Sequence, residues 1–539
     1  MVYDLPICLL LDVTYVKKSK SRGIIASSFA VSVFVIFTKA VGFIKQAVIA
    51  ACYGATAETD AFFLASGFMA SFGLMIFSSL SVTLLTMYVR EKERGEVFAN
   101  QLVNSTLKLF IPVSLALSFL LFVFSDAVAF VLAPAYDAGS LAVVSYYLRL
   151  LCIVVFLYCP YLILNAVLEA NKVFLAGRVL ALLQSVFLII AALAFSSSGD
   201  VIVLIIAFAL ASVINLVYIA LRAARYVKYD RSAPLWSPEM KTLLELMLPV
   251  LLGNAVLEVN SIAEKAVASA LGEGSVSALT YGWSVYEIVT GVIISALATV
   301  LFSYFAGYLA KDDIDGMTRC LEKCNTTLTL ILIPVTVVTV LCADDIVSVL
   351  YLRGNFDDSA RNATSLVVST YALGFVPTAI RSVLTKAHYA FQDSTTPMYN
   401  GITTVAVGAA GAAILAVWCN IGIAGVGIAV SFSMALSAAL YQRSIAKRLP
   451  ACRFDGEKAV FAGKCVVAGL VSFVAGILIR KAILLAGFSS ALVTAAISLI
   501  CVAAVAFAVF FAVAYALHVK EIPYVFSMIT ARIRRNGEE

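Results

Sequence analysis

The first long apolar stretch of this chain reads SSFAVSVFVIFTKAVGFIKQAVIAACY and extends from Ser27 to Tyr53. It is long enough to cross a bilayer, which takes roughly 20 apolar residues in a helix. Two lysines, Lys39 and Lys45, interrupt the stretch. Because a charge at the centre of a membrane helix costs roughly 2.5–3.5 kcal/mol on insertion scales, such residues usually face a cavity, a partner or a ligand. The stretch therefore predicts a membrane helix that carries two functional cations.

The rest of the chain has the same apolar character. Of its 539 residues, 62% are hydrophobic and only 13% are charged, which is typical of a polytopic membrane protein and excludes a soluble globular class. His388 and His518 are the only histidines, so neither a histidine-based metal site nor a Ser-His-Asp triad is expected. Most of the eleven cysteines lie in apolar runs, and we interpret them as small hydrophobic residues.

Fourteen apolar runs are long enough to cross a membrane, and they predict an all-α polytopic membrane protein with 14 transmembrane helices. The runs lie near residues 25–52, 60–89, 103–133, 141–168, 174–197, 200–224, 242–271, 276–309, 321–343, 362–391, 397–419, 421–446, 457–483 and 489–518. Alternate connections differ sharply in charge. Almost all loop lysines and arginines fall on one side of the membrane. The exceptions, assigned to the outer side, are Arg353, Arg361, Arg480 and Lys481. The positive-inside rule places both termini in the cytoplasm.

A weak internal repeat appears at a separation near 218 residues. AVIA at 47–50 resembles AVAS at 266–269, and VLAPAYD at 131–137 resembles VLYLRGNFD at 349–357. An even number of spans per half gives the halves one orientation, so the pattern predicts two parallel six-helix repeats followed by two C-terminal helices. The expected domains begin with an N-terminal cytoplasmic extension (1–24) and an N-lobe (25–226). A C-lobe (241–447), a pair of helices (457–519) and a cytoplasmic tail (520–539) follow.

Four motifs in order resemble the MurJ/MviN family of lipid II flippases, within the superfamily of multidrug, oligosaccharidyl-lipid and polysaccharide exporters. The first is TKAVGFIK at 38–45 with YGA at 53–55 and TDAFF at 59–63, in which lysine stands at both of the family's arginine positions. The others are ASALGEGSVSALTY at 268–281, RGNFD at 353–357 with YALG at 371–374, and KAHYAFQD at 386–393 with Thr396-Pro397. The chain departs from the family at Gly73 and Ser284, where many relatives carry arginines associated with substrate handling.

The resemblance implies a transporter rather than an enzyme. It would flip lipid II across the bacterial inner membrane by alternating access, for peptidoglycan biosynthesis. The alternatives are a flippase for another lipid-linked oligosaccharide of capsule or exopolysaccharide, which Gly73 and Ser284 favour, and a cation-coupled drug antiporter. No cofactor or nucleic acid is expected; the partners are the lipid-linked substrate and membrane lipids. A coupling ion, Na⁺ or H⁺, and a monomeric state are open.

The family's substrate is a polyprenyl diphosphate with a disaccharide-peptide, and lysine binds phosphate as a point charge. Lys39 and Lys45 lie about 9 Å apart along a helix axis and about 120° apart in rotation, so both can face a broad cavity. Alternatively, Lys45 extends to the membrane interface. Asp60 begins the second span near Lys45 and is interpreted as its partner in an outer gate. It is equally explained as a carboxylate favoured by the helix dipole, and the two interpretations are compatible.

The matching stretch of the second half is acidic. A shift of 219 residues places Glu258 opposite Lys39 and Glu264 opposite Lys45. With Glu287, these carboxylates are candidates for gate bridges or for a coupling-cation site; purely structural pairing is the alternative. Lys265 either faces the cavity, as a substrate-binding residue, or pairs within the bundle. Substrate-binding candidates at the cytoplasmic end are Arg381 and Lys386, although ordinary positive-inside flanks explain them too.

Overall fold

The computed structural model describes residues 22–196, 199–486, 491–519 and 521–522, and this part of the chain is helical with no strand. It forms two compact units. The N unit comprises residues 20–281 together with 353–360, and the C unit comprises 282–352 and the residues from 361 onward. The expected extension at 1–24 and tail at 520–539 lie almost entirely outside the described residues, and the expected lobe boundaries stay predictions.

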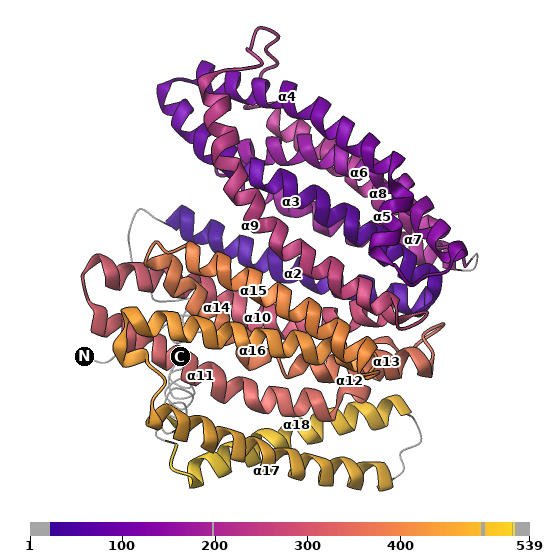
Figure 1. Ribbon diagram of the computed structural model, residues 1–539, viewed down its shortest axis with the longest axis vertical. Helices are drawn as coiled ribbons and strands as arrows, with labels where there is room; N and C mark the ends of the chain where they lie inside the picture. The colour runs from indigo at the N-terminus through magenta and orange to yellow at the C-terminus, as the bar shows by residue number, and fades with distance from the viewer. Residues whose placement is uncertain (1–21, 197–198, 487–490, 520, 523–539) are drawn as a thin grey trace. The chain divides into compact units, whose positions relative to one another are not determined.

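α6 lies among α3, α4 and α8 in the N unit (Figure 1). α6 packs against these three helices, and nearly three quarters of the residues in its most apolar segment are buried. The helices are α2 (Arg22–Tyr53), α3 (Ala57–Arg94), α4 (Glu96–Val123), α5 (Ser125–Leu132), α6 (Ala138–Ala170), α7 (Val179–Phe195), α8 (Ile202–Ala223) and α9 (Pro238–Ser269). The grouping of α9 with α2–α8 follows from its packing on α3.

Local sequence signals set the helix ends. Thr56 and Thr59 form a reciprocal capping box at the start of α3, which satisfies backbone N–H groups that the helix itself cannot. Ser237 caps α9, and Pro238 follows at the position where a missing N–H costs least. Gly95 separates α3 from α4 at φ 144°, a conformation open to glycine but rare for other residues.

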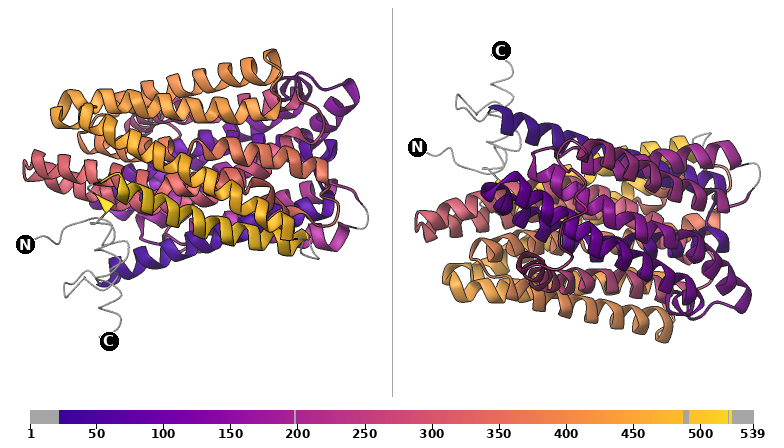
Figure 2. Two further views of the ribbon diagram at one scale, coloured as in Figure 1. Left: turned by 90° about the horizontal axis from the view of Figure 1, so that it is seen from below. Right: turned by 90° about the horizontal axis from the view of Figure 1, so that it is seen from above.

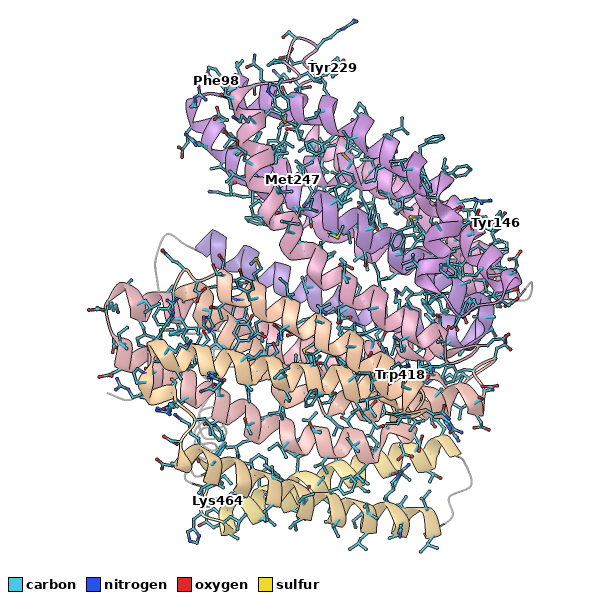
Figure 3. The ribbon with its side chains drawn as sticks, viewed as in Figure 1. Phe98, Tyr146, Tyr229, Met247, Trp418 and Lys464 are labelled. Carbon is cyan, nitrogen blue, oxygen red and sulfur yellow. The ribbon has the colours of Figure 1, made fainter. Side chains whose placement is uncertain are left out.

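The connection between α8 and α9, residues 224–237, is held on α4. Asn104 donates to the Lys228 carbonyl at 2.9 Å and accepts from the Asp230 N–H at 3.0 Å. Lys108 donates to the carbonyls of Arg231 and Ala233, both at 2.8 Å. Tyr229 remains exposed at the end of the N unit (Figure 3). These hydrogen bonds hold the polar loop between α8 and α9 against α4.

The C unit contains the remaining helices, apart from the first residues of α10 and α13, which belong to the N unit. Several of these helices run side by side in the views of Figure 2. α13 and α14 form one apolar pair bent by 47° at Leu373–Gly374. α15 continues as a single π-helical segment to Trp418, which lies at its end (Figure 3). The helices are α10 (Ser275–Ala310), α11 (Ile314–Leu341), α12 (Ala343–Tyr351), α13 (Asp358–Ala372), α14 (Phe375–Ala390), α15 (Thr395–Ala412), α16 (Ile423–Arg448), α17 (Gly456–Ala486) and α18 (Ala491–Ala516).

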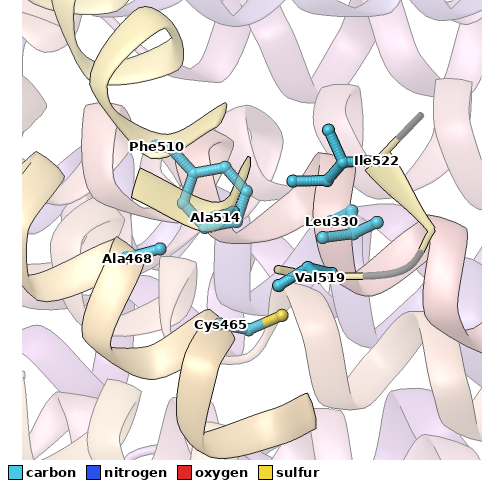
Figure 4. Packing of buried hydrophobic residues seen from close by; sticks show 7 residues of the cluster. All are labelled: Leu330, Cys465, Ala468, Phe510, Ala514, Val519 and Ile522. Atoms are coloured by element: carbon cyan, nitrogen blue, oxygen red, sulfur yellow. The ribbon is translucent and has the colours of Figure 1, made fainter. Parts of the chain in front are cut away.

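The last two helices, α17 and α18, pack on each other and on α11. Leu330 of α11 shares a buried cluster with Cys465, Phe510 and Ile522 (Figure 4). A polar contact lies nearer the other end: Asp345 of α12 accepts from Ser498 at 3.0 Å and lies 3.1 Å from Arg480 Nε. Arg480, which sequence analysis assigned to a loop, is therefore part of α17 and binds a buried carboxylate.

The expected all-α polytopic fold is confirmed. Within the described residues, twelve helices are long and apolar enough to span a membrane, or thirteen if the bent α13–α14 pair counts as one span. The remaining predicted span, 276–309, coincides with α10, a helix of 36 residues. Each of the fourteen predicted positions thus holds a helix or a bent helix pair.

Candidate functional site

The two lysines of the first span lie on α2, which packs against α7. Lys39 is exposed and Lys45 is half-buried. Gly42, midway between them, lies near Ser185 of α7, so the small residue brings the two helices close. α2 is continuous past both lysines, and their placement on one uninterrupted apolar helix is as predicted from sequence. Their binding role stays a prediction.

Asp60 lies in the first turn of α3 and is fully buried. Its Oδ1 accepts the Ser277 N–H at 2.6 Å, and its Oδ2 accepts the Tyr136 hydroxyl at 3.2 Å. Ser277 Oγ also donates to Thr59 Oγ1 at 3.0 Å. Burial, together with the Asp60 carboxylate, raises the pKa of Tyr136 far above its ordinary value, so this hydroxyl stays a donor. Asp60 thus joins three segments that are far apart in sequence.

Residues 353–357 complete this meeting point. The Asn355 N–H donates to the Ala51 carbonyl at 2.9 Å, and its side chain donates to the Cys52 carbonyl at 2.6 Å. Tyr281 donates to the Gly54 carbonyl at 2.9 Å and packs edge-on against Phe356. We call residues 51–60, 136, 274–281 and 353–357 the glycine junction.

The glycines of the junction are required by both space and backbone angle. Gly54, Gly274 and Gly354 all have positive φ, at 70°, 79° and 58°. A Cβ at Gly354 would lie 2.2 Å from the Ala51 carbonyl oxygen, and one at Gly274 would lie 2.5 Å from that of Ala55. No side chain fits at these distances, so the backbones of three segments touch only because glycine is present.

The charged residues of α9 separate onto different partners. Lys265 donates to the Phe63 carbonyl of α3 at 3.2 Å and occupies the space beside Gly67. Glu264 is buried and accepts from Asn260, one turn earlier. Glu258 is half-buried. The adjacent Glu264 and Lys265 therefore do not share a direction, since Lys265 points to α3.

Asn254 is a polar residue of α9 that sequence analysis missed. Its amide donates to Ser78 Oγ at 3.2 Å and to Ser79 Oγ at 3.0 Å, both on α3. With Lys265, it ties α9 to α3 at two levels about 16 Å apart along the helix, at 1.5 Å per residue. An asparagine inside an apolar run was the available signal, because buried amides need partners.

The surroundings of Gly73, one of the two departures from the motif pattern, leave no room for a side chain. A Cβ at this position would lie 2.6 Å from Tyr158 Cδ2. Tyr158 is buried, and its hydroxyl accepts from Gln184 at 3.0 Å. The tyrosine ring of α6 therefore fills the space that a side chain at position 73 would enter. Ser284, the other departure named from sequence, is half-buried on α10.

In the C unit, Glu287 is exposed on α10, whereas Arg381 and Lys386 are half-buried on α14. Arg381 contacts Met434 Sδ of α16 at 3.8 Å. The Lys386 ammonium lies 5.9 Å from the centre of the Tyr389 ring, within the range of a cation–π contact.

A polar cluster at the end of α14 centres on Asp393. Its Oδ2 lies 3.2 Å from His388 Nδ1 and accepts from Arg448 at 3.0 Å. Its two oxygens accept the Thr396 N–H at 3.0 Å and hydroxyl at 2.8 Å. Burial alone raises the pKa of Asp393, but the hydrogen bonds from Thr396 and His388 lower it to about 2. The cluster connects α14, α15 and α16.

We expect Asp393→Asn to lower the melting temperature of the detergent-purified protein at pH 7. A carboxyl group with a lowered pKa stabilises the fold above its ordinary value of 3.8, and that contribution disappears as the pH falls toward 2. The difference between variant and wild type should therefore shrink below about pH 4. Asp315→Asn, which neutralises an exposed carboxylate of α11, is the control and should change little. A constant deficit from pH 7 to pH 3 would contradict the electrostatic explanation.

Comparison with known families completes this description. Residues 49–496 match the family model described as "Lipid II flippase MurJ". The chain belongs to the MurJ family. This matched range contains Asp60, the glycine junction and all of α17. It begins after Lys39 and Lys45 and ends near the start of α18.

Individual members of the MurJ family are similar over shorter ranges. A "Probable lipid II flippase MurJ" of Rhizobium tropici is 29% identical over 37% of this chain and 38% of its own length. One of Vibrio cholerae is 29% identical over 39% of this chain and 41% of its own length, so the chain matches about two fifths of each. One of Buchnera aphidicola subsp. Schizaphis graminum is 22% identical over 71% of this chain and 76% of its own length.

Solved structures show the fold. The structure "Lipid II flippase MurJ, inward closed conformation" has a TM-score of 0.75 at 18% identity and covers 90% of this chain and 98% of its own. An inward-facing multidrug resistance MATE family transporter of the MOP superfamily has a TM-score of 0.66 at 16% identity, over 83% and 99%. The chain thus shares the MurJ architecture, and MATE transporters are its structural neighbours.

Proposed function

We propose that this protein is a flippase that moves lipid II from the inner to the outer leaflet of the bacterial inner membrane for peptidoglycan biosynthesis. Membership of the MurJ family supports it over the drug-antiporter alternative. The observation that carries the proposal is Lys39, an exposed cation on a continuous apolar helix. An ammonium group exposed to lipid would carry a large free-energy cost, so this face of α2 would line a hydrated chamber.

In the proposed mechanism, Lys39 and Lys45 attract the diphosphate of the headgroup, while the polyprenyl chain stays in the bilayer. Lysine suits this task because it acts on phosphate as a compact point charge. Access alternates between the two sides of the membrane, with both termini in the cytoplasm, as the charge bias favours. The glycine junction would close one side, and its buried carboxylate Asp60 supports that role.

The acidic residues Glu258, Glu264 and Glu287 are proposed to serve gating or coupling, with Na⁺ or H⁺ as the coupling ion. Glu264 already accepts from Asn260, which suits a carboxylate whose hydrogen bonding changes with ion occupancy. Lys265 is bound to α3 and is assigned a positioning role. Arg381 and Lys386 would meet the incoming diphosphate.

Complementation tests the proposal directly. The wild-type chain, expressed in a bacterium whose own lipid II flippase is depleted, should restore growth and the appearance of lipid II in the outer leaflet. A strain depleted of a capsule or exopolysaccharide flippase should not be restored. The opposite pattern would assign the chain to another lipid-linked oligosaccharide.

A further inference from the structure

Four aromatic side chains of the C unit form a compact group around α10. Trp283 and Tyr286 of α10 lie with ring centres 5.0 Å apart, and Trp283 meets Tyr371 of α13 edge-on at 5.7 Å. Tyr286 stacks on Phe375 of α14 at 5.4 Å with 18° between the planes. Such offset and edge-on arrangements are the favoured geometries of aromatic pairs. Together these residues form what we call the aromatic platform.

Three members of the platform are buried, and neighbouring residues hold them in position. Tyr286, Tyr371 and Phe375 are at most 5% exposed, and the Tyr286 hydroxyl shares a 2.6 Å hydrogen bond with Thr378. Gly282 lets α10 approach α13, because a Cβ there would lie 2.4 Å from Val367 Cγ1. The support for the fourth ring, Trp283, is therefore rigid.

Trp283 itself is different, because 40% of its surface is exposed. A fully packed core would have covered an indole of this size. Instead, one part of the ring rests on Tyr286 and Tyr371 while the remainder is open. The arrangement presents a large, flat apolar surface at the edge of a buried cluster.

The face of α10 that carries Trp283 also carries a charge. Glu287 follows four residues later, one turn along the same face, and it too is exposed. A carboxylate in an apolar helix is costly against lipid and is normally directed to the bundle interior or to a water-filled cavity. Glu287 therefore indicates that Trp283 borders a hydrated space rather than lipid chains.

We propose that the aromatic platform binds a sugar ring of the substrate headgroup, with Trp283 as the stacking surface and Glu287 accepting hydrogen bonds from hydroxyl groups. A pyranose has one face of C–H groups and a rim of hydroxyls. The C–H face suits the electron-rich face of an indole, and the rim suits a neighbouring carboxylate. This inference rests on the proposed function, because lipid II supplies the saccharide.

The aromatic platform on α10 and the two lysines on α2 would bind different parts of the substrate. Lys39 and Lys45 would bind the diphosphate, which every polyprenyl diphosphate carries. Trp283 would respond only to lipids that carry a sugar. Specificity for the glycosylated lipid, rather than for the carrier alone, is thus a property of α10.

Binding measurements on the full-length protein in detergent test this separation. The probes are lipid II and undecaprenyl diphosphate, which has the same anchor without sugars. We expect Trp283→Ala to weaken lipid II binding about tenfold and to leave undecaprenyl diphosphate binding within twofold. Trp283→Phe should recover most of the loss. Trp418→Ala, which removes an 86% exposed tryptophan at the end of α15, should bind both lipids like wild type.

A second readout is independent of any damage caused by the alanine. In a protein with Trp236→Phe and Trp418→Phe, Trp283 is the sole tryptophan, and its emission should change on addition of lipid II but not of undecaprenyl diphosphate. Equal loss of both lipids in Trp283→Ala, or equal emission changes, would make Trp283 an interfacial anchor and overturn the proposal. A wild-type protein that binds undecaprenyl diphosphate but not lipid II would overturn it as well. Failure of the wild type to bind either lipid would instead reject the proposed function.

Discussion

Replacing Lys39 with alanine is expected to abolish complementation of a lipid II flippase depletion strain while leaving the protein folded and inserted. The ammonium is exposed on an apolar helix, where a charge opposes insertion by roughly 2.5–3.5 kcal/mol. Its removal should therefore not destabilise the protein. The loss would fall on substrate binding, because the diphosphate would lose a close positive charge.

Three measurements separate this effect from misfolding. Membrane abundance and melting temperature of Lys39→Ala should match the wild type, whereas outer-leaflet lipid II should fall at least tenfold. Lys39→Arg, which matches the residue type of the family pattern, should keep most activity. Lys464→Ala removes a half-buried lysine of α17 whose ammonium donates to the His518 carbonyl, and it should transport normally. Normal growth of Lys39→Ala as the sole flippase would reject the cationic site.

Asp60→Ala is expected to destabilise the N unit strongly. The carboxylate is fully buried and accepts from the Ser277 N–H and the Tyr136 hydroxyl. Alanine leaves the buried Ser277 N–H without an acceptor, at a cost of roughly 1–3 kcal/mol. It also removes the acceptor of the half-buried Tyr136 hydroxyl. The melting temperature should fall by several degrees, and the thiol of Cys52, which lies in the junction, should react faster with a maleimide.

The matched variants identify the cause. Asp60→Asn keeps an oxygen that can accept the Ser277 N–H, so its loss should be smaller. Glu58→Ala removes an exposed carboxylate from the same helical turn and should leave both the melting temperature and Cys52 labelling unchanged. If Glu58→Ala and Asp60→Ala behave alike, the effect belongs to the helix dipole, which favours any carboxylate in the first turn, and not to the junction.

The span positions were predictable because the signal is local. A bilayer requires about twenty apolar residues in succession, so each span is recorded in its own stretch of sequence. α13 and α14 are the exception in detail, since one predicted run at 362–391 became a pair bent by 47°. The residues at the bend, Leu373–Gly374, lie in the YALG motif, but nothing in the hydropathy gives an angle.

The glycine junction shows what sequence patterns do not reveal. Asp60 was selected as a candidate, yet its partners Ser277 and Tyr136 were not, because they lie far away in the chain. The repeat analysis did match the segment at 131–137 with that at 349–357, and the structure brings residues of both to the junction. Similar loops in two halves were thus a usable signal, but the pairing of atoms depends on tertiary packing.

The helix α9 answers a question that spacing left open. Adjacent helical residues point about 100° apart, so either Glu264 or Lys265 could have faced a neighbour. Lys265 reaches the Phe63 carbonyl because Gly67 leaves room for its ammonium. The sequence contained both residues, but their approach could be seen only with the helices in place.

The docking of α17 and α18 has a practical consequence for shortening the chain. Removing these two helices would leave twelve, the number contained in the paired repeats, and lipid could cover the apolar strip on α11 at little cost. Asp345 could not be covered in the same way, because it is buried with Ser498 and Arg480 as its hydrogen-bond and ionic partners. A truncated protein would have to protonate this carboxylate or expose it. α17 and α18 therefore cannot be removed without a further change. A version of this transporter that lacks them needs Asp345→Asn or a similar neutral replacement.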